Sequence, residues 1–294
     1  MIFYKSVASG NDFLHVDTRE FQAYVKAITA NAGVTPGKGS LVERLCRRHT
    51  GAGADGLVYY TITPSAVKFE IFNQDGNEAE LSGNGMGGLA ALMFYLELFL
   101  DRVTLDTRVG RRTHTLLSRH GNCFRINIEI GPPDFAATHF FPFLEKDKDK
   151  YKLEYQYNGL TFYPVSVGNP HVVVIPAKHM EDNELEMLGR QLESAEIFPH
   201  KTNVEFVMAA GQGPVCYETG ANVRLFFYER GVGRTLASST GSAAVFAVLQ
   251  KLGKLTDRLI ITGQNQGEKV IISGKENIYI ENSVEIVYKG VLEI

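Results

Sequence analysis

Short runs of apolar or alternating residues dominate the chain, and glycine or polar residues separate them. Runs of this length are typical of β-strands bounded by turns. The strands predicted in the N-terminal half are 2–7, 13–16, 56–62, 66–72, 102–106 and 123–130. Those predicted in the C-terminal half are 153–157, 160–167, 172–175, 203–208, 222–228, 259–262, 269–272, 278–281 and 283–288.

Four helices are predicted among these strands, at 40–49, 87–100, 183–194 and 242–251. Helix 183–194 is amphipathic. Helices 87–100 and 242–251 are apolar on nearly every side, which is typical of a buried helix. Helices spaced among many strands indicate an α/β (α+β) fold with substantial antiparallel content.

One sequence pattern occurs twice. Asn73 precedes Ser82 by nine residues, and Glu229 precedes Ser238 by the same number. Each copy comprises a strand, a polar loop, a small polar residue, a glycine and a buried helix. A duplicated unit of this kind predicts two similar lobes with related loops facing a shared cleft. Chance similarity between glycine-rich turns is the alternative explanation.

Composition narrows the function classes. The chain has 294 residues, 44% of them hydrophobic, and a net charge of −3, which argues against a nucleic-acid or anionic-membrane surface. Its longest apolar run, 89–100, is too short to span a bilayer, and we see no signal peptide at the start of the sequence. The scattered Cys46, Cys123 and Cys216 predict reduced thiols in a cytoplasmic protein.

The two serine-containing turns are candidate ligand sites. Their sequences are Ser82-Gly83-Asn84-Gly85 and Ser238-Ser239-Thr240-Gly241, and each leads into a helix. Unpaired N–H groups at a helix start hold anions, so two such turns could bind a carboxylate and stabilise negative charge beside it. Serine also favours the N-cap position for structural reasons alone, and this interpretation stays open.

Other polar residues could complete such a site. Arg230 could clamp a carboxylate, and His171 and Glu229 could orient an amine or move a proton. The glycines at 83, 85 and 88 match a dinucleotide motif, but the preceding strand ends about ten residues too early for that site. The eight histidines show no metal-ligand spacing, so no metal is predicted.

These motifs resemble those of a known protein family. The chain resembles diaminopimelate epimerases over nearly its full length, at residues 10–13, 53–56, 72–73, 75–76, 83–85, 168–171, 203–204, 228–231 and 233. The resemblance implies two pseudo-symmetric lobes, each a curved, mostly antiparallel sheet around a central helix. The expected lobes are 1–125, joined by a C-terminal strand at 283–294, and 126–282. It also implies a homodimer that uses neither pyridoxal phosphate nor a metal.

The implied reaction converts LL- to meso-diaminopimelate, a precursor of lysine and peptidoglycan. In this family one cysteine removes the α-proton and a second protonates the opposite face. The substrate-binding residues carry over to Asn11, Asn73, Asn169, Asn203 and Arg230. The histidine and glutamate near the reacting centre carry over to His171 and Glu229.

The match breaks at the two cysteines, because their positions carry over to Ser82 and Ser238. A helix N-terminus can tune a thiol to a thiolate, whereas a serine hydroxyl needs an adjacent base. We therefore expect severely reduced activity from the ordinary two-cysteine mechanism. The serines are either engineered or natural, and further departures at Gly87, Gly88, Arg234 and Ser239 favour natural divergence.

Three hypotheses follow from the sequence. The first is an isomerase that acts on an amino acid or a related carboxylic acid, with Glu229 or His171 as the base. The second is a non-catalytic protein that binds such a ligand. The third, a dinucleotide oxidoreductase, has only the glycine pattern in its favour.

Overall fold

The computed structural model describes residues 1–147, 152–209, 215–217, 219, 223–263 and 267–293. Its contacts divide the chain into two compact units. The N-terminal unit comprises Met1–Glu129 and Glu281–Ile294, and the C-terminal unit comprises Ile130–Ile280. The first residue of the predicted strand 222–228 lies outside the described residues.

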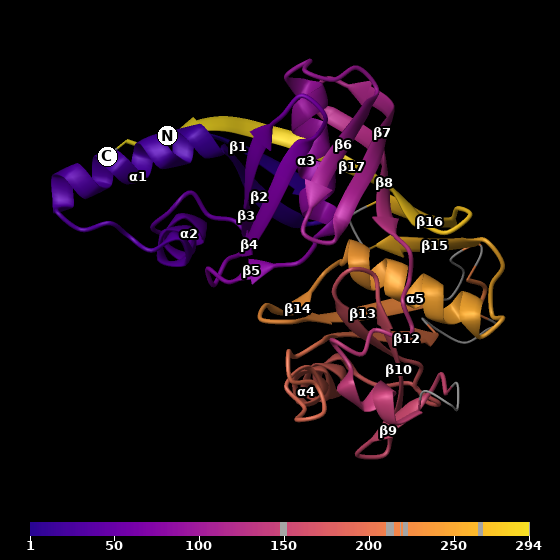
Figure 1. Cartoon of the computed structure of the whole chain (residues 1–294). Helices are drawn as coiled ribbons and strands as arrows, with labels where there is room; N and C mark the ends of the chain where they lie inside the picture. The colour runs from indigo at the N-terminus through magenta and orange to yellow at the C-terminus, as the bar shows by residue number, and fades with distance from the viewer. Residues whose placement is uncertain (148–151, 210–214, 218, 220–222, 264–266, 294) are drawn as a thin grey trace. The chain divides into compact units, whose positions relative to one another are not determined.

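The N-terminal unit is a sheet wrapped around one helix (Figure 1). Its strands run in the order β1-β2-β3-β4-β6-β7-β8, β5 pairs with β4, and β17 pairs with β1. The strands are β1 (Ile2–Ala8), β2 (Asn11–Asp17), β3 (Gly56–Ile62), β4 (Val67–Asn73), β5 (Glu78–Ala79), β6 (Arg102–Thr107), β7 (Gly110–His120), β8 (Cys123–Gly131) and β17 (Ile278–Val291). The helices are α1 (Thr18–Ala32), α2 (Lys38–Cys46) and α3 (Gly83–Tyr95).

The C-terminal unit has a six-stranded sheet in the order β14-β13-β12-β11-β10-β9. These strands are β9 (Tyr155–Tyr157), β10 (Leu160–Ser166), β11 (Pro170–Val174), β12 (Asn203–Ala209), β13 (Val223–Glu229) and β14 (Gly233–Thr235). An antiparallel hairpin of β15 (Arg258–Gly263) and β16 (Gly267–Ser273) follows. The helices are η1 (Pro142–Asp147), α4 (Asp182–Glu193) and α5 (Ser239–Lys251).

The pairing pattern confirms the predicted duplication. In the first copy β1–β2 is antiparallel, β2–β3 parallel, and β3–β4 and β4–β5 antiparallel. The strands β10 to β14 repeat this sequence of pairings. A 13-residue buried helix follows each copy, α3 in one and α5 in the other. The fold is thus α+β with sheet-dominated cores, as predicted.

Side-chain alternation places a different layer on each face of the C-terminal sheet. Even-numbered residues of β11, β12 and β13, such as Val172, Phe206 and Phe226, belong to a core that includes Leu185 and Leu192 of α4. Odd-numbered residues face α5, which packs against β10, β11 and β12. A polar residue at an odd position of these strands is therefore enclosed beneath α5.

Both predicted boundaries of α3 were wrong for identifiable reasons. Helix α3 begins at Gly83 rather than at residue 87, because burial and the cap at Ser82 outweigh the poor helix propensity of its glycines. It ends at Tyr95 rather than at residue 100, and Glu97 just beyond has a φ of 57°, which a continuing helix cannot accommodate.

Five elements were not predicted, namely α1, β7 and the short β5, η1 and β14, and α1 and β7 are the longest of them. Helix α1 buries only Phe21 and Tyr24, so its apolar pattern is weak in the sequence, although Asp17 caps its start. Strand β7 is rich in polar residues, and its pairing with β6 on one side and β8 on the other holds it in the sheet. No helix in the described part of the chain is long and apolar enough to cross a membrane.

Two histidines of the N-terminal unit are completely buried. His15 on β2 shares a hydrogen bond of 2.7 Å between Nε2 and Ser6 Oγ, and His114 Nδ1 accepts one of 3.2 Å from the Glu129 amide. Burial lowers the pKa of each imidazole to about 3. Both rings therefore stay neutral in the folded protein at pH values where an exposed histidine is charged.

This burial predicts an acid-sensitive stability. Below a pH of about 6.5 the unfolded chain protonates both histidines while the folded chain does not, so stability is lost as pH falls. Lowering the pH from about 6.5 to about 5.5 costs about 1 kcal/mol per histidine. Urea unfolding at the two pH values measures this loss. The double variant His15→Gln/His114→Gln should lose less, whereas His179→Gln, at a largely exposed position, should behave as wild type. An undiminished loss in the double variant would contradict the assignment.

Candidate active site

Ser238 caps the buried helix α5 and contacts a carboxylate at the same time. Its Oγ accepts a hydrogen bond of 3.1 Å from the Gly241 amide, which is the N-cap arrangement considered from the sequence. The same hydroxyl donates to Glu229 Oε2 at 3.2 Å. The N-cap explanation for this serine is therefore correct but incomplete, because the hydroxyl also has a neighbouring base.

Glu229 ends β13 and lies in a protected position. Its Oε1 accepts a hydrogen bond of 2.5 Å from Thr235 of β14. Removal from solvent raises the pKa of the Glu229 carboxyl above its usual value, and the negative charge of Glu205 adds to the rise. The hydrogen bonds from Thr235 and Ser238 and the nearby His171 act in the opposite direction. Glu229 is thus a more basic carboxylate than an exposed glutamate.

His171 lies on β11, completely buried, between two polar partners. Its Nδ1 is 2.8 Å from Glu205 Oε1, and its Nε2 is 2.9 Å from Asn169 Oδ1. The register explains the first contact, because His171 pairs with Asn203 and the side chain of Glu205, two residues along β12, projects from the same face. The sheet thus brings His171 and Asn169 together with a third polar residue, Glu205.

The side chain of Asn203 bonds to the backbone amide of Arg230. Asn203 Nδ2 donates to the Pro170 carbonyl at 2.7 Å, and its Oδ1 accepts from the Arg230 amide at 3.0 Å. The Arg230 guanidinium donates to the His200 carbonyl at 3.3 Å. The side chain of Asn203 therefore ties the start of β11 to the turn after β13, and so fixes the loops that carry the other polar groups.

The first helical turn of α5 completes this group. Ser239 and Thr240 are its first two residues, and both are almost completely buried. Together with Ser238 they place backbone amides at the positive end of the helix dipole. This end of α5 suits a carboxylate or another developing negative charge.

Ser82 occupies the matching position in the N-terminal unit but has a simpler environment. Its Oγ accepts a hydrogen bond of 3.1 Å from the Gly85 amide and caps α3. The equivalent of Glu229 is Asn73, at the end of β4, and no hydrogen bond joins the two side chains in the described residues. Among those residues, no carboxylate or imidazole bonds to the Ser82 hydroxyl. The two serines therefore share a backbone geometry and differ in chemistry.

A chain of amides runs beside Ser82. Asn11 Nδ2 donates to Asp55 at 3.3 Å, Asn84 Nδ2 donates to Asn11 Oδ1 at 2.6 Å, and Asn282 Nδ2 donates to Asn84 Oδ1 at 3.2 Å. Ser9 Oγ closes the chain with a bond of 2.7 Å to Asn282 Oδ1. The structure thus joins Asn11 and Asn84 with residues that sequence reasoning did not select. Gly83 is the first residue of α3, directly beside this chain.

An ionic cluster fixes the start of β2, at Asp12. Arg48 donates two hydrogen bonds to Asp12 and one to Asp55, and Lys5 Nζ lies 2.8 Å from Asp12. Burial alone would raise the pKa of Asp12, but the bonds from Arg48 and Lys5 lower it to about 2. Burial and the charge of Asp12 raise the pKa of Asp55. The cluster holds Asp55, which in turn orients Asn11.

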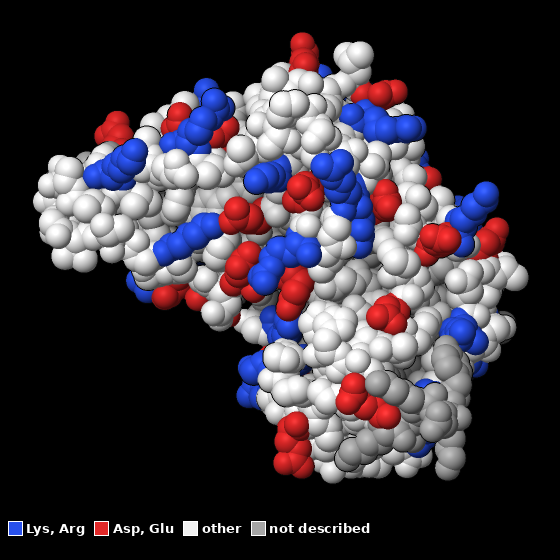
Figure 2. All heavy atoms as spheres, in the orientation of Figure 1, with Lys and Arg blue, Asp and Glu red and all other residues white. Residues whose placement is uncertain are grey.

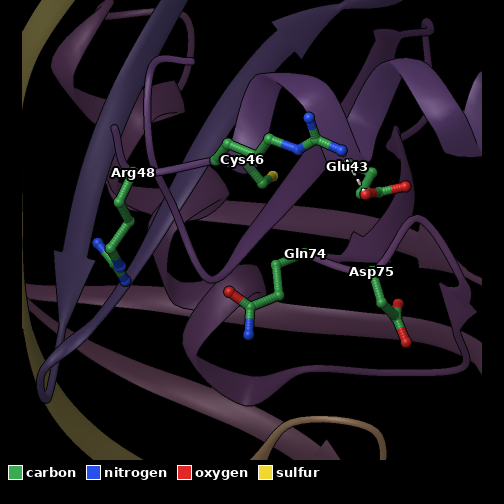
Figure 3. A pocket seen from close by; sticks show the side chains of 6 residues that line it. Glu43, Cys46, Arg48, Gln74 and Asp75 are labelled. Carbon is green, nitrogen blue, oxygen red and sulfur yellow. Dashed lines mark hydrogen bonds and ion pairs between the residues drawn. The ribbon is translucent and has the colours of Figure 1, made fainter. Parts of the chain in front are cut away.

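A cavity of about 330 Å³ in the N-terminal unit lies next to this cluster. Figure 3 shows its lining, which comes from the end of α2 and the turn after β4: Glu43, Cys46, Arg47, Arg48, Gln74 and Asp75. None of the predicted site residues lines it. Burial raises the pKa of the Cys46 thiol to about 12, so this cysteine cannot replace the missing thiolates.

Two unusual glycines in α3 have a packing reason. A Cβ atom at position 88 would lie 2.4 Å from Ser6 Oγ and 2.8 Å from His15 Nε2. A Cβ atom at position 87 would lie 2.7 Å from Ile128 Cδ1. Larger side chains at these two positions would therefore need a different interior beneath α3. Gly87 and Gly88 are matched to the residues that pack against them.

Five further polar residues belong to these groups, namely Ser9, Asp55, Thr235, Asn282 and Glu205. Asp55 lies in the matched stretch 53–56. Of the other four, only Glu205 had a signal in the sequence, because it is the one charged residue in the apolar run Asn203–Ala209. The other three are recognisable only from the strand pairings. No group of histidine, cysteine or acidic residues in the described ranges is arranged to hold a metal ion.

Surface charge adds little to this picture. Among the described residues on the face drawn in Figure 2, basic and acidic side chains lie next to one another, and no broad area of that face carries a single sign. Pairs such as Lys38 with Glu70 and Arg125 with Glu281 have this character. The buried polar groups at the helix starts, rather than the surface, are the chemically distinctive part of the molecule.

Known proteins agree with this architecture. The family model described as diaminopimelate epimerase matches residues 3–136 and 163–289. The diaminopimelate epimerase of Carboxydothermus hydrogenoformans is 30% identical over 296 residues, covering 99% of this chain and 98% of that protein. That of Caldanaerobacter subterraneus subsp. tengcongensis is 30% identical over 302 residues, covering all of both chains.

Solved structures show the same fold at lower identity. A crystal structure described as a probable proline racemase from Agrobacterium radiobacter has a TM-score of 0.68 and 14% identity, covering 100% of this chain and 93% of that one. The matched ranges include both serine-capped helices and the strands that enclose them. The chain belongs to the diaminopimelate epimerase family.

Proposed function

We propose that this chain is a cofactor-independent isomerase of the diaminopimelate epimerase type, in which Glu229 and Ser238 move the α-proton of an amino-acid substrate. The observation that carries the proposal is the hydrogen bond of 3.2 Å between Ser238 Oγ and Glu229 Oε2 at the start of α5. A serine hydroxyl becomes useful for proton transfer when a base lies next to it. This serine has one.

The electrostatics of the C-terminal unit support this role. Desolvation makes Glu229 a stronger base than an exposed glutamate, which helps it to accept a proton from carbon. The amides at the start of α5 can bind the substrate carboxylate and stabilise the negative charge that develops beside it. Asn169, Asn203 and Arg230 are the further substrate-binding residues that we propose in this unit.

The N-terminal unit contributes differently. Ser82 has no base within hydrogen-bonding distance in the described residues, so it can donate or relay a proton but cannot readily remove one from carbon. Asn11, Asn73, Gly83 and Asn84 are its proposed binding residues. We therefore expect Glu229 with Ser238 to give efficient α-proton exchange, and we expect the inversion that needs Ser82 to be slow.

The substrate is proposed to be LL- or meso-diaminopimelate, or another amino acid. The relatives from Carboxydothermus hydrogenoformans and Caldanaerobacter subterraneus are named diaminopimelate epimerases, which supports this choice of substrate. The proposed role is in the synthesis of lysine and peptidoglycan precursors, as the family resemblance implies. We also retain two predictions, namely that the chain forms a homodimer and that it is cytoplasmic.

The serines are proposed to be native to this chain. Gly87 and Gly88 depart from the family pattern, and each is fitted to its neighbours Ile128, Ser6 and His15. Replacing two cysteines by design would not require these coordinated changes. They support natural divergence of the site.

A second candidate function is supported by the surroundings of Ser82, where no carboxylate or imidazole among the described residues bonds to its hydroxyl. A protein that retains a carboxylate-binding helix start but lacks one of two bases could bind an amino acid without turning it over. This candidate predicts saturable binding of diaminopimelate with no solvent deuterium entering the α-position. The proposed isomerase predicts both binding and exchange.

Replacing Glu229 by glutamine tests the proposed base. Glu229→Gln should lower the rate of α-deuterium incorporation by roughly 10²-fold or more, since one general base contributes roughly 10²–10⁴-fold. In wild type this rate should rise with pH through the raised pKa of Glu229, because the base acts when it is deprotonated. Exchange in D₂O followed by proton NMR gives both quantities. A Glu229→Gln protein that exchanges at the wild-type rate would remove Glu229 from the mechanism.

The two capping serines provide a matched pair of variants. Ser82→Ala and Ser238→Ala each lose an N-cap hydroxyl and should each lose about 1 kcal/mol of stability. Only Ser238→Ala also removes a hydroxyl that is bonded to a base, so only this variant should lose most of its deuterium exchange. Denaturant unfolding and the exchange assay are run on both. Equal loss of exchange in the two variants would argue against the asymmetry between the units.

A cysteine at position 82 tests whether inversion is slow because Ser82 lacks a base. Ser82→Cys places a thiol at the start of α3, where the helix dipole favours the thiolate. Inversion of configuration at the α-carbon, measured by chiral chromatography of diaminopimelate, should become faster than in wild type. The control is Ser40→Cys, at an exposed site on α2, which should leave the rate unchanged. If neither the wild type nor Ser82→Cys inverts or exchanges any substrate, the binding candidate is favoured.

A further inference from the structure

Glu205 is a completely buried carboxylate in the middle of an apolar strand. It lies on β12 between Val204 and Phe206, and its side chain is on the face of the sheet beneath α5. Burying an ionised carboxylate is costly unless it is paired or hydrogen-bonded. The surroundings of Glu205 should therefore explain why it is there.

Two features stabilise a negative charge at this position. Glu205 Oε1 is 2.8 Å from His171 Nδ1. The first turn of α5 also lies against the carboxylate, since a Cβ atom at Gly241 would be only 2.7 Å from Oε1. Glycine at 241 permits this approach, and the positive end of the helix dipole favours an anion there. The second oxygen, Oε2, has no hydrogen-bond partner among the described residues.

The other nitrogen of His171 also meets an acceptor. Nε2 is 2.9 Å from Asn169 Oδ1. A neutral imidazole carries one N–H donor and one acceptor nitrogen, whereas the imidazolium carries two donors. An acceptor at each nitrogen is satisfied only when both nitrogens carry protons. The arrangement is then an ion pair that His171 and Glu205 form inside the sheet, with Asn169 holding the far side of the ring.

We propose that Glu205 is a positioning residue that keeps His171 doubly protonated and fixed in orientation. His171 is then a fixed positive charge beside Glu229 rather than a second base. The positive charge of His171 stabilises negative charge that develops near the start of α5, and the proton is accepted by Glu229 with Ser238 and not by His171. The mechanistic part of this inference rests on the proposed function, but the protonation state of His171 does not.

The protonation state can be observed directly in the full-length protein. In a sample labelled with ¹⁵N-histidine, the His171 signals are assigned by their loss in a His171→Asn variant. At pH 7.5, wild type should show two protonated ring nitrogens for His171. Glu205→Gln replaces the carboxylate by an amide of the same shape, and the ring should become neutral, with one unprotonated nitrogen.

The control is Glu193→Gln. Glu193 is another buried carboxylate of the same unit, which bonds Lys201 and the Gly231 amide and does not contact His171. This variant should leave the two His171 N–H signals in place. Circular dichroism and thermal unfolding of each variant separate a local change from loss of the fold.

Two results would overturn the inference. One is a wild-type His171 with an unprotonated nitrogen at pH 7.5, which would mean that Asn169 presents its amide nitrogen to the ring. The other is a Glu205→Gln protein, shown to be folded, in which both nitrogens stay protonated. Neither result depends on activity, so failure of the isomerase proposal in the exchange assay is distinguished from failure here.

Where exchange is observed, activity adds a second readout. Glu205→Gln should lower kcat for exchange more than it raises KM, because the charge on His171 matters most when negative charge develops on the substrate. A change confined to KM would show that Glu205 affects binding alone and would remove it from the proposed mechanism.

Discussion

The capping of two buried helices is the constraint on which the rest of this structure depends. Helices α3 and α5 are surrounded by protein along nearly their whole length, so water cannot satisfy the free amides at their first turns. Ser82 and Ser238 each provide an acceptor for one of these amides. A side chain at either position must therefore cap a helix before it can do any chemistry.

The two copies meet this constraint identically and diverge in their electrostatics. Residue 73 is an asparagine and residue 229 is a glutamate, at the same place in the repeated strand pattern. The glutamate places a base beside one capping serine, and the glutamate's own burial makes that base stronger. In the other copy the matching residue is Asn73, and linked amides of Asn11, Asn84 and Asn282 lie at the start of α3. Duplication thus gave one geometry that carries two kinds of chemistry.

Buried charge in this protein is consistently paired. Asp12 is held by Arg48 and Lys5, and Glu205 lies against His171 and the start of α5. His15 and His114 have no acidic side-chain partner among the described residues, and burial keeps their rings neutral instead. These four buried ionisable groups are therefore either neutral or compensated, as the low polarity of the interior requires. Glu229 differs because it accepts hydrogen bonds from Thr235 and Ser238 but forms no ion pair among the described residues, and its raised proton affinity suits a base.

The sequence by itself determined the fold class, the repeated unit, the two buried helices and the family. Each of these depends on local patterns of apolar residues, glycines and motifs. It also placed serine at both cysteine positions. Only the tertiary structure decided which serine has a base, since the contact between Ser238 and Glu229 depends on the turn between them. The pairing of Glu205 with His171 was likewise invisible, because it joins residues 34 positions apart through the register of two strands.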